Sequence, residues 1–534
     1  MPFSNKTMTV NDKPDSAVAA SAMLVSNLAR PDAFPHAVDR IEILETHISW
    51  VILTGTYAYK IKKPLDLGFL DFSTLDLRKH FCQEELRLNQ RFAPKIYVDI
   101  VPVGGSRDQP EVGIEPALDW AVRMHEFAAD ARLDRQVQQN QISISDMQTL
   151  GETIAGVHKR APVALRDGQF GTADAVCKPT QDNFLSLTRD CTDPALQQQL
   201  SALEQWNAAE IERLKPAFQQ RLEQGRIREC HGDLHLANLV RIDDRIVAFD
   251  CLEFSPALRW IDVISEVGFL VMDTLAHGKP DLGYAFLNRY LEVSGDYSGV
   301  ALLPFYLVYR CLVRAKVAAV LHRQSSGSSD LTPITRYLDL AASLANPGGK
   351  PILIITHGLS GSGKTWLTSS VMAQIPAIRL RSDLERKRLH GLSDLQSSGS
   401  GVAGGIYSSS ASANTYAHLA RMARICLSAG FDTIVDAAFL WQEQRSMFHS
   451  VARDLQLPFA ILDCHASHAT LRQRIEARSA AGTDVSEADL GVLEHQLAIE
   501  VQLSEAERQH VIRLDTETTI DTEALLQKIR AGKP

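Results

Sequence analysis

Residues 351–365 read PILIITHGLSGSGKT, and this stretch is the strongest indication of the fold of the C-terminal half of the chain. The apolar, β-branched run 352–355 leads into the spacing Gly-x-x-x-x-Gly-Lys-Thr, which begins at Gly358, and the helix-compatible stretch WLTSSVMAQI follows. This order predicts a strand, a phosphate-binding loop and a helix. Glycines let backbone N–H groups turn toward phosphate oxygens, and the helix adds its positive N-terminal dipole.

The loop predicts a binding site for ATP and Mg²⁺ that begins near residue 350. We expect Lys364 to reach the β- and γ-phosphates and Thr365 to hold Mg²⁺. The remaining residues expected to contact nucleotide are Gly358, Ser360, Gly361, Ser362 and Gly363.

Composition narrows the class of protein and its compartment. With 534 residues, 45% hydrophobic and 22% charged, the chain is long enough for two to four globular domains of roughly 150 residues each. The net charge of −9 argues mildly against a nucleic-acid scaffold. The eight cysteines form no Cys-x-x-Cys pair, which is typical of reduced cytosolic thiols.

Membrane association is not expected. The N-terminus lacks the apolar core of a secretory signal, and the apolar stretch 301–320 contains Arg310, Arg314 and Lys316, which a membrane span would exclude. We therefore expect a cytoplasmic protein with loose residues at its start, and nothing in the sequence sets an oligomeric state.

The N-terminal half begins with strand patterns. Residues 41–64 alternate as paired strands around a turn at Thr54 and Gly55, and Lys60 and Lys62 share one face of the second strand. A helical segment over 75–94 follows, and strands return at 95–103 and 119–124. The pattern predicts a small mixed sheet with one helix, followed by mostly helical regions to residue 344.

The second chemical stretch is IRECHGDLHLANLVRIDDRIVAFDCLEF, residues 227–254. Asp233 and Asn238 have the spacing of a kinase catalytic loop, and Asp250 follows a predicted hairpin. An Asp can orient a hydroxyl and take its proton, while an Asn and a second carboxylate can hold Mg²⁺. A polar loop that merely caps turns is the alternative, and for Asp250 alone it would be preferred.

HGDLHLAN followed by FD resembles the aminoglycoside phosphotransferase and choline kinase-like superfamily, a branch of the protein-kinase-like fold, over residues 41–344. The resemblance implies that Asp233 is the catalytic aspartate and that Asn238 and Asp250 are Mg²⁺ ligands. It also implies that a strand lysine binds the ATP phosphates and that a glutamate on a helix forms an ion pair with this lysine.

By that resemblance Lys60 would be the phosphate lysine and Glu85 its ion-pair partner, with Lys62 and Glu84 as neighbouring alternatives. The segment 122–127 would be the hinge along the adenine. No Gly-x-Gly-x-x-Gly lies between the first two predicted strands, so the phosphate lid must differ from that of protein kinases.

The strands after the phosphate loop end in carboxylates. Asp383 follows the strand AIRLR and could act as general base, with Arg386 nearby, or it could simply cap a helix. Asp436 ends a buried strand and is the expected second partner of Mg²⁺. Arg474 and Arg478, one helical turn apart, could close over the transferring phosphate or form a solvated face.

This half resembles the small P-loop kinases grouped with zeta toxins, gluconate kinase and polynucleotide kinase. The matching pieces are GLSGSGKT, RSDLERKRL, VDAAFL and LRQRIEARSAAGTDVSEAD. The resemblance implies ATP-dependent phosphorylation of a small-molecule hydroxyl, with both arginines in a lid. The Gly/Ser-rich stretch 397–413 is either a substrate-side lid or a plain loop.

Taken whole, the chain is similar to bacterial two-domain proteins that fuse an aminoglycoside phosphotransferase-like domain to a P-loop AAA-type ATP-binding domain. The expected fold class is α/β and α+β, with a bilobal protein-kinase-like domain before a P-loop domain with a mostly parallel sheet. The expected division is a loose segment 1–37, a kinase domain 38–345 and a P-loop domain 346–534.

The leading hypothesis is a phosphotransferase with two ATP/Mg²⁺ sites that acts on a small-molecule hydroxyl. A nucleotide-gated regulator is one alternative. Polynucleotide kinase activity of the C-terminal half is another, and it would use a basic cluster. That cluster comprises Arg379, Arg381, Arg386, Lys387 and Arg388.

Overall fold

The structure, a computed structural model, describes residues 16–68, 70–324, 330–401, 403–481 and 485–531. It divides into two compact units. The first unit comprises Met1–Gln139 and Glu229–Ile261, and the second comprises Asn140–Arg228 and Asp262–Pro534. This division cuts through the predicted kinase domain, because the helices that precede residue 346 belong to the same unit as the P-loop domain. The boundaries at 38 and 346 stay predictions.

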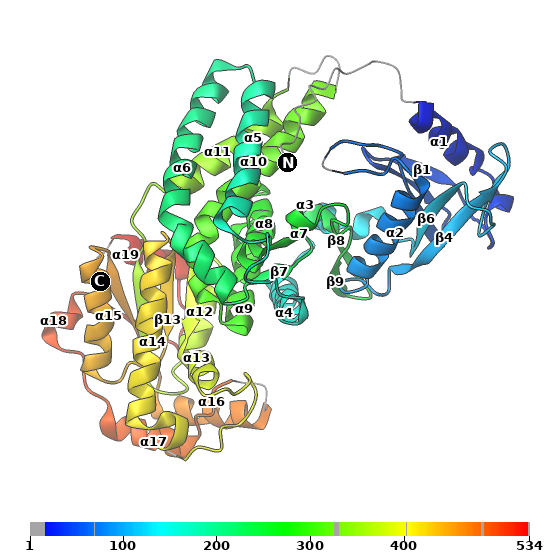
Figure 1. Cartoon of the computed structure of the whole chain (residues 1–534). Helices are drawn as coiled ribbons and strands as arrows, with labels where there is room; N and C mark the ends of the chain where they lie inside the picture. The colour runs from blue at the N-terminus through cyan, green and yellow to red at the C-terminus, as the bar shows by residue number, and fades with distance from the viewer. Residues whose placement is uncertain (1–15, 69, 325–329, 402, 482–484, 532–534) are drawn as a thin grey trace. The chain divides into compact units, whose positions relative to one another are not determined.

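The first unit is built on a six-stranded sheet of order β1-β2-β3-β6-β4-β5. Its neighbouring strands pair antiparallel. Helix α2 (Leu75–Asn89) contacts β4 and β6, and Thr74 caps it by accepting a hydrogen bond from the Leu77 N–H (Figure 1). The strands are β1 (Glu42–Glu45), β2 (Ser49–Leu53), β3 (Tyr57–Lys62), β4 (Tyr97–Gly105), β5 (Pro110–Val112) and β6 (Asp119–His125).

The first predicted strand run is in fact a hairpin of two strands. Between β1 and β2 the Thr46 N–H donates to the Ser49 carbonyl at 2.8 Å, and Thr46 Oγ1 donates to the same carbonyl at 2.9 Å. Alternating hydrophobicity continues through this turn, so the pattern alone could not reveal it.

The expectation of a loose N-terminal segment is wrong from Ser16 onward. Residues Ser16–Asn27 form α1, and Leu24, Val25 and Leu28 pack into one hydrophobic cluster with Trp50 of the sheet. The helix has no strong amphipathic pattern and is stabilised by this burial, which a local sequence signal does not report. Residues 1–15 lie outside the described part of the chain.

The rest of the first unit carries the predicted catalytic loop. Strands β8 (Leu239–Ile242) and β9 (Arg245–Ala248) form the expected hairpin, in which Leu239 pairs with Ala248. Strands β7 (Ile227–Glu229) and β10 (Trp260–Asp262) lie at the two points where the chain passes between units. The shorter elements are η1 (Pro31–Ala33), η2 (Ala129–Ala131), α3 (Leu133–Gln138), η3 (Leu236–Asn238) and α7 (Pro256–Arg259).

The second unit begins with a helical region. Helices α4 and α9 pack against each other, as do α10 and α11. Helix α10, the stretch too charged for a membrane span, buries Arg310, whose Nε donates to the Ser265 carbonyl at 3.2 Å. The elements are α4 (Ile144–Arg160), α5 (Ala173–Asp190), α6 (Pro194–Glu223), α8 (Val263–Ala276), α9 (Pro280–Ser294), η4 (Tyr297–Leu302), α10 (Leu303–Gln324) and α11 (Thr332–Ala345).

The P-loop part of the second unit is a five-stranded sheet of order β12-β13-β11-β14-β15, and all its pairings are parallel. Every residue of the central strand β11 is buried, as expected for a parallel sheet covered on both faces. The fold class expected from the sequence is confirmed here. The strands are β11 (Leu353–His357), β12 (Ala377–Arg381), β13 (Asp432–Asp436), β14 (Phe459–His465) and β15 (Val511–Asp515).

Helices cover this sheet and connect its strands (Figure 1). They are α12 (Lys364–Met372), α13 (Ser382–Leu389), η5 (Gly405–Tyr407), α14 (Ser409–Ser428), α15 (Gln442–Asp454), α16 (His468–Ala481), α17 (Leu490–Ile499), α18 (Glu505–Arg508) and α19 (Thr522–Ala531).

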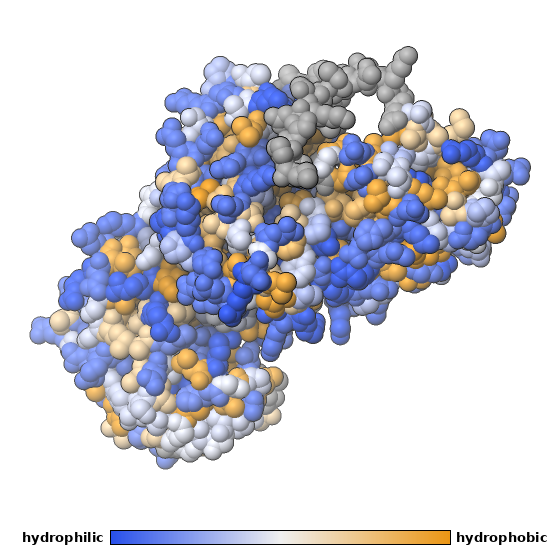
Figure 2. All heavy atoms as spheres, in the orientation of Figure 1, coloured by the Kyte–Doolittle hydropathy of each residue, from blue (hydrophilic) through white to orange (hydrophobic). Residues whose placement is uncertain are grey.

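The surface in view is mostly polar. Figure 2 shows hydrophilic residues spread over this face, with hydrophobic residues in smaller patches between them. Among the described residues, no helix combines the length and the apolar character that crossing a membrane would require.

Candidate active sites

The phosphate loop has the backbone that its glycines permit. Gly358, Gly361 and Gly363 have φ values of 137°, 83° and 82°, which side chains disfavour. A Cβ on Gly358 would lie 2.4 Å from the Cys464 carbonyl oxygen, so the close approach of β14 also requires glycine there. Helix α12 starts directly after the loop, which places its N-terminal N–H groups at the site.

Lys364 lies along the loop that it is predicted to serve. Its Nζ donates to the carbonyls of Gly358 at 2.9 Å and Leu359 at 2.7 Å. Burial lowers the pKa of Lys364, because the ammonium loses hydration that these neutral carbonyls only partly replace. A phosphate anion would supply the missing counter-charge.

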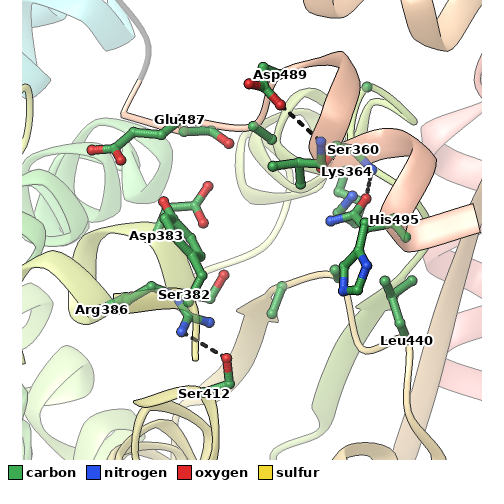
Figure 3. Close-up of a pocket in the computed structure, with 18 of the residues that line it drawn as sticks. Ser360, Lys364, Ser382, Asp383, Arg386, Ser412, Leu440, Glu487, Asp489 and His495 are labelled. Carbon is green, nitrogen blue, oxygen red and sulfur yellow. Dashed lines mark hydrogen bonds between the residues drawn. The ribbon is translucent and has the colours of Figure 1, made fainter. Parts of the chain in front are cut away.

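A cavity of about 790 Å³ opens over the phosphate loop. Figure 3 shows Lys364, Asp383 and His495 around this space, with Glu487 and Asp489 on a neighbouring segment. Asp383 is the second residue of α13, and the helix-capping position belongs to Arg381, so the interpretation of Asp383 as an N-cap is wrong. Its carboxylate is available to a ligand in the cavity.

The two predicted Mg²⁺ partners, Thr365 and Asp436, line the same cavity. Thr365 is the second residue of α12, and Asp436 is the last residue of β13. Thr368 Oγ1 lies 3.4 Å from Asp436 Oδ2, which links helix and strand beside the site. Hydroxyl and carboxylate oxygens are suitable ligands for Mg²⁺.

Arg474 and Arg478 both border the cavity. The Arg474 guanidinium donates to the Gly361 carbonyl at 3.3 Å and to Thr516 Oγ1 at 2.9 Å, and that of Arg478 donates to the Ala488 carbonyl at 2.8 Å. The alternative of a solvated helix face therefore does not describe them. Arg474 is held against the phosphate loop itself.

The Gly/Ser-rich stretch is anchored by a residue that the sequence analysis missed. Glu487 accepts a hydrogen bond from the Ser398 N–H at 2.9 Å and another from Ser398 Oγ, and it pairs with Lys387 at 3.1 Å. These groups come from separate segments, so no local pattern could have revealed them. Described residues of this stretch line the cavity, among them Ser397, Gly399, Ser400 and Tyr407.

In the first unit, one lysine bridges two carboxylates. Lys60 Nζ on β3 lies 2.8 Å from Glu85 Oε1 on α2 and 2.5 Å from Asp250 Oδ1 after β9. Glu84 instead pairs with Arg87 on its own helix. The structure therefore brings together the three residues implied by the resemblance for the phosphate lysine, its partner and one Mg²⁺ ligand.

Lys62 belongs to the same buried cluster. Its Nζ lies 2.6 Å from Glu85 Oε2 and also bonds Glu253, a residue that the sequence analysis did not single out. The side chains of Lys62, Glu85 and Glu253 are almost completely buried. Lysines on a strand are usually in solvent, but Lys60 and Lys62 are both buried.

Charge pairing outweighs burial at Glu85. Burial acts to raise its pKa, but the ammonium groups of Lys60 and Lys62 lower it to about 2. Burial raises the pKa of Glu253, which lies at the end of the cluster and faces Lys62. Glu85 is therefore ionised at neutral pH and forms ion pairs with both lysines.

The catalytic-loop residues also come together. Asn238 Nδ2 donates to Asp233 Oδ2 at 2.9 Å, and His235 Nε2 lies 3.3 Å from the same oxygen. The Asn238 carbonyl accepts from the Phe249 N–H at 3.0 Å, which joins this loop to the segment carrying Asp250. The sequence analysis did not predict the contact between His235 and Asp233, although His235 lies only two residues after Asp233.

Comparisons with known proteins find similarity to the C-terminal half and to most of the chain. Residues 353–500 match the family model described as an AAA domain, which confirms the resemblance of the C-terminal half to such ATP-binding domains. Uncharacterized proteins of Mycobacterium tuberculosis and Mycobacterium bovis are 27% identical to this chain over 450 residues. The alignment covers 84% of this chain and 88% of each relative, so it includes parts of both predicted domains.

Solved structures align with each half. A choline/ethanolamine kinase family protein from Mesorhizobium loti aligns with 61% of this chain and 95% of its own, with 11% identity and a TM-score of 0.38. A putative kinase from Chloroflexus aurantiacus aligns with 35% and 100%, with 21% identity and a TM-score of 0.28. At these TM-scores neither structure bears on the chemistry of this chain.

Proposed function

We propose that the chain is an ATP-dependent phosphotransferase that phosphorylates a hydroxyl of a small molecule. The observation that carries the proposal is the composition of the cavity over the phosphate loop. One space is lined by a lysine for phosphate, two oxygen ligands for Mg²⁺, a carboxylate for an acceptor hydroxyl and two arginines. These are the groups that positioning and charge stabilisation of a transferring phosphoryl group require.

In this proposal a bound Mg²⁺ would neutralise charge on the nucleotide phosphates. Lys364 and the loop N–H groups bind the phosphates, while Thr365 and Asp436 hold the ion. Asp383 orients the acceptor hydroxyl and takes its proton. Arg474 and Arg478 stabilise the charge that develops on the transferring group.

We propose a second ATP/Mg²⁺ site in the first unit. Lys60, fixed by Glu85, binds the phosphates, and Asn238 with Asp250 holds Mg²⁺. Asp233 takes the proton from the hydroxyl of a second substrate. Support comes from the 2.8 Å Lys60–Glu85 pair and from the hydrogen bond between Asp233 and Asn238.

The test is transfer from γ-labelled ATP into a pool of small metabolites by the full chain. We compare wild type with Asp233→Asn, Lys364→Ala and the control Asp244→Asn, a similar change at an exposed hairpin position. A labelled product lost only in Asp233→Asn, or only in Lys364→Ala, assigns the active site. The proposal fails if ATP binds but no variant changes transfer, and a nucleotide-gated regulator is then the better description.

The basic cluster gives little support to the polynucleotide kinase alternative. Four of its five residues make ion pairs or hydrogen bonds inside the protein, including Arg386, which also lines the cavity over the phosphate loop. Arg379 pairs with Glu292, Lys387 with Glu487 and Arg388 with Glu385. Arg386 donates to the Ile406 carbonyl at 2.9 Å and is buried. The observations therefore favour a small acceptor over a nucleic acid.

A further inference from the structure

Helix α9 of the helical region closes the open edge of the P-loop sheet. Strand β12 is an edge strand, and its backbone groups would otherwise lack a neighbour on one side. The Asn288 side chain on α9 meets this need. Its Nδ2 donates to the Ala377 carbonyl at 2.8 Å, and its Oδ1 accepts from the Arg379 N–H at 2.7 Å. The buried Asn288 amide thus makes two backbone hydrogen bonds of the kind that a neighbouring strand would make.

The same helix fixes the side chain of Arg379. Glu292 Oε1 accepts from Arg379 Nη2 at 2.8 Å and from Nε at 3.2 Å, and both side chains are buried. The third nitrogen, Nη1, donates to Ser369 Oγ at 2.9 Å and lies 3.5 Å from Thr368 Oγ1. The guanidinium therefore joins α9 to the helix that follows the phosphate loop.

The two hydroxyls lead on to the proposed Mg²⁺ ligands. Ser369 Oγ donates to the Thr365 carbonyl at 2.8 Å, and Thr368 Oγ1 lies 3.1 Å from the same oxygen. Thr368 Oγ1 also lies 3.4 Å from Asp436 Oδ2. A continuous set of polar contacts therefore runs from Glu292 through Arg379 to both Thr365 and Asp436.

We propose that Arg379 is a positioning residue of the P-loop site, and that Glu292 on α9 orients it. Residues that hold metal ligands in place affect metal affinity without touching the ion. Helix α9 lies outside the AAA-domain match and inside the predicted kinase domain. The helical region would then be a working part of the P-loop site. This inference rests on the proposed function of that site.

The charges explain why the pair should be sensitive. A buried guanidinium without its carboxylate would leave an unbalanced positive charge beside Thr368 and Ser369, and Glu292 without Arg379 would keep only the longer pair with Arg289, at 3.8 Å. Arg379 contacts α9 and α12 at once through three nitrogens. A lysine carries one nitrogen on a flexible stem and could not keep both connections.

The experiment measures binding of a fluorescent ADP analogue to the full chain as Mg²⁺ is titrated, and again in EDTA. The variants are Arg379→Met, Arg379→Lys and Glu292→Gln. The matched control is Arg424→Met, which removes an exposed ion pair between Arg424 and Asp454 elsewhere in the P-loop part of the second unit. Lys364→Ala identifies the signal that comes from the P-loop site.

For Arg379→Met we expect the Mg²⁺ concentration at half-maximal binding to rise about tenfold, at the lower end of the effect of lost outer-shell contacts. Arg379→Lys and Glu292→Gln should show smaller rises, while the control stays at the wild-type value. Binding in EDTA should change less than twofold in every variant except Lys364→Ala. A purely structural role would weaken both kinds of binding together.

Two results would overturn the inference while leaving the proposed function standing. One is an unchanged Mg²⁺ dependence in Arg379→Met and Glu292→Gln. The other is an equal loss of binding with and without Mg²⁺ in Glu292→Gln, the nearly isosteric variant that keeps a hydrogen-bond acceptor. If wild type itself shows no binding that Lys364→Ala removes, the proposed P-loop site fails, and the inference fails with it.

Discussion

Replacement of Glu85 by glutamine tests the buried charge cluster of the first unit. Glu85 is fully buried and accepts from Lys60 at 2.8 Å and from Lys62 at 2.6 Å. The glutamine amide has nearly the same shape but no charge. Each lysine keeps one other carboxylate, Asp250 or Glu253, so the cluster weakens without leaving a lone buried ammonium.

The size of the effect follows from the pKa of Glu85. The two ammonium groups lower that pKa from 4.5 to about 2, and at about 1.4 kcal/mol per pKa unit the shift corresponds to about 3 kcal/mol. Because the pKa is depressed in the folded state, this stabilisation is complete above pH 4.5 and is lost as the pH falls toward 2. Glu85→Gln should therefore lower local stability at pH 7 by about 3 kcal/mol, and by progressively less below pH 4.5.

Hydrogen exchange of the amides in β3 and α2, followed by mass spectrometry on the full chain, reports the local free energy of opening. Glu84→Gln is the matched control. Glu84 is the adjacent residue, but its side chain is partly exposed. It pairs with the half-exposed Arg87 at 2.8 Å and with Arg259 at the longer distance of 3.5 Å, so we expect a loss of about 1 kcal/mol or less.

Equal exchange in Glu85→Gln and Glu84→Gln at pH 7 would refute the reasoning. So would a difference from wild type that grows as the pH falls below 4.5. Either outcome would mean that the lysines are held by packing and by the other carboxylates.

Further predictions concern the other contacts of the two sites. Asn238→Ala should reduce Mg²⁺-dependent transfer at the proposed first site at least tenfold, with little change in nucleotide binding in EDTA. The substitution removes one proposed Mg²⁺ ligand and the hydrogen bond to Asp233. Unchanged transfer would contradict this role. Glu487→Gln should increase hydrogen exchange over residues 397–401, where Ser398 loses a charged acceptor, whereas the exposed control Glu494→Gln should leave that segment unchanged. Ser398→Ala should raise exchange there to a similar degree if this contact anchors the stretch, and protection equal to wild type would show that other contacts hold it.

Sequence patterns predict the parts of the protein whose geometry is local. The phosphate loop is contiguous, so β-branched residues, three glycines and a following helix specify its shape without help from distant segments. The spacing of Asp233 and Asn238 likewise lies within one loop, and the structure joins the two by a hydrogen bond. The parallel sheet followed from apolar strands that alternate with helices and end in carboxylates.

Which charged residues meet depends on tertiary packing, and the sequence pattern does not predict it. Lys60 and Lys62 share a strand face, so alternation cannot separate them, and both in fact bind one glutamate. Adjacent helix residues point about 100° apart, so whether Glu84 or Glu85 faces the sheet depends on how α2 packs. Glu292 and Arg379 lie far apart in sequence. Long-range pairing depends on the docking of whole elements, which no local pattern encodes.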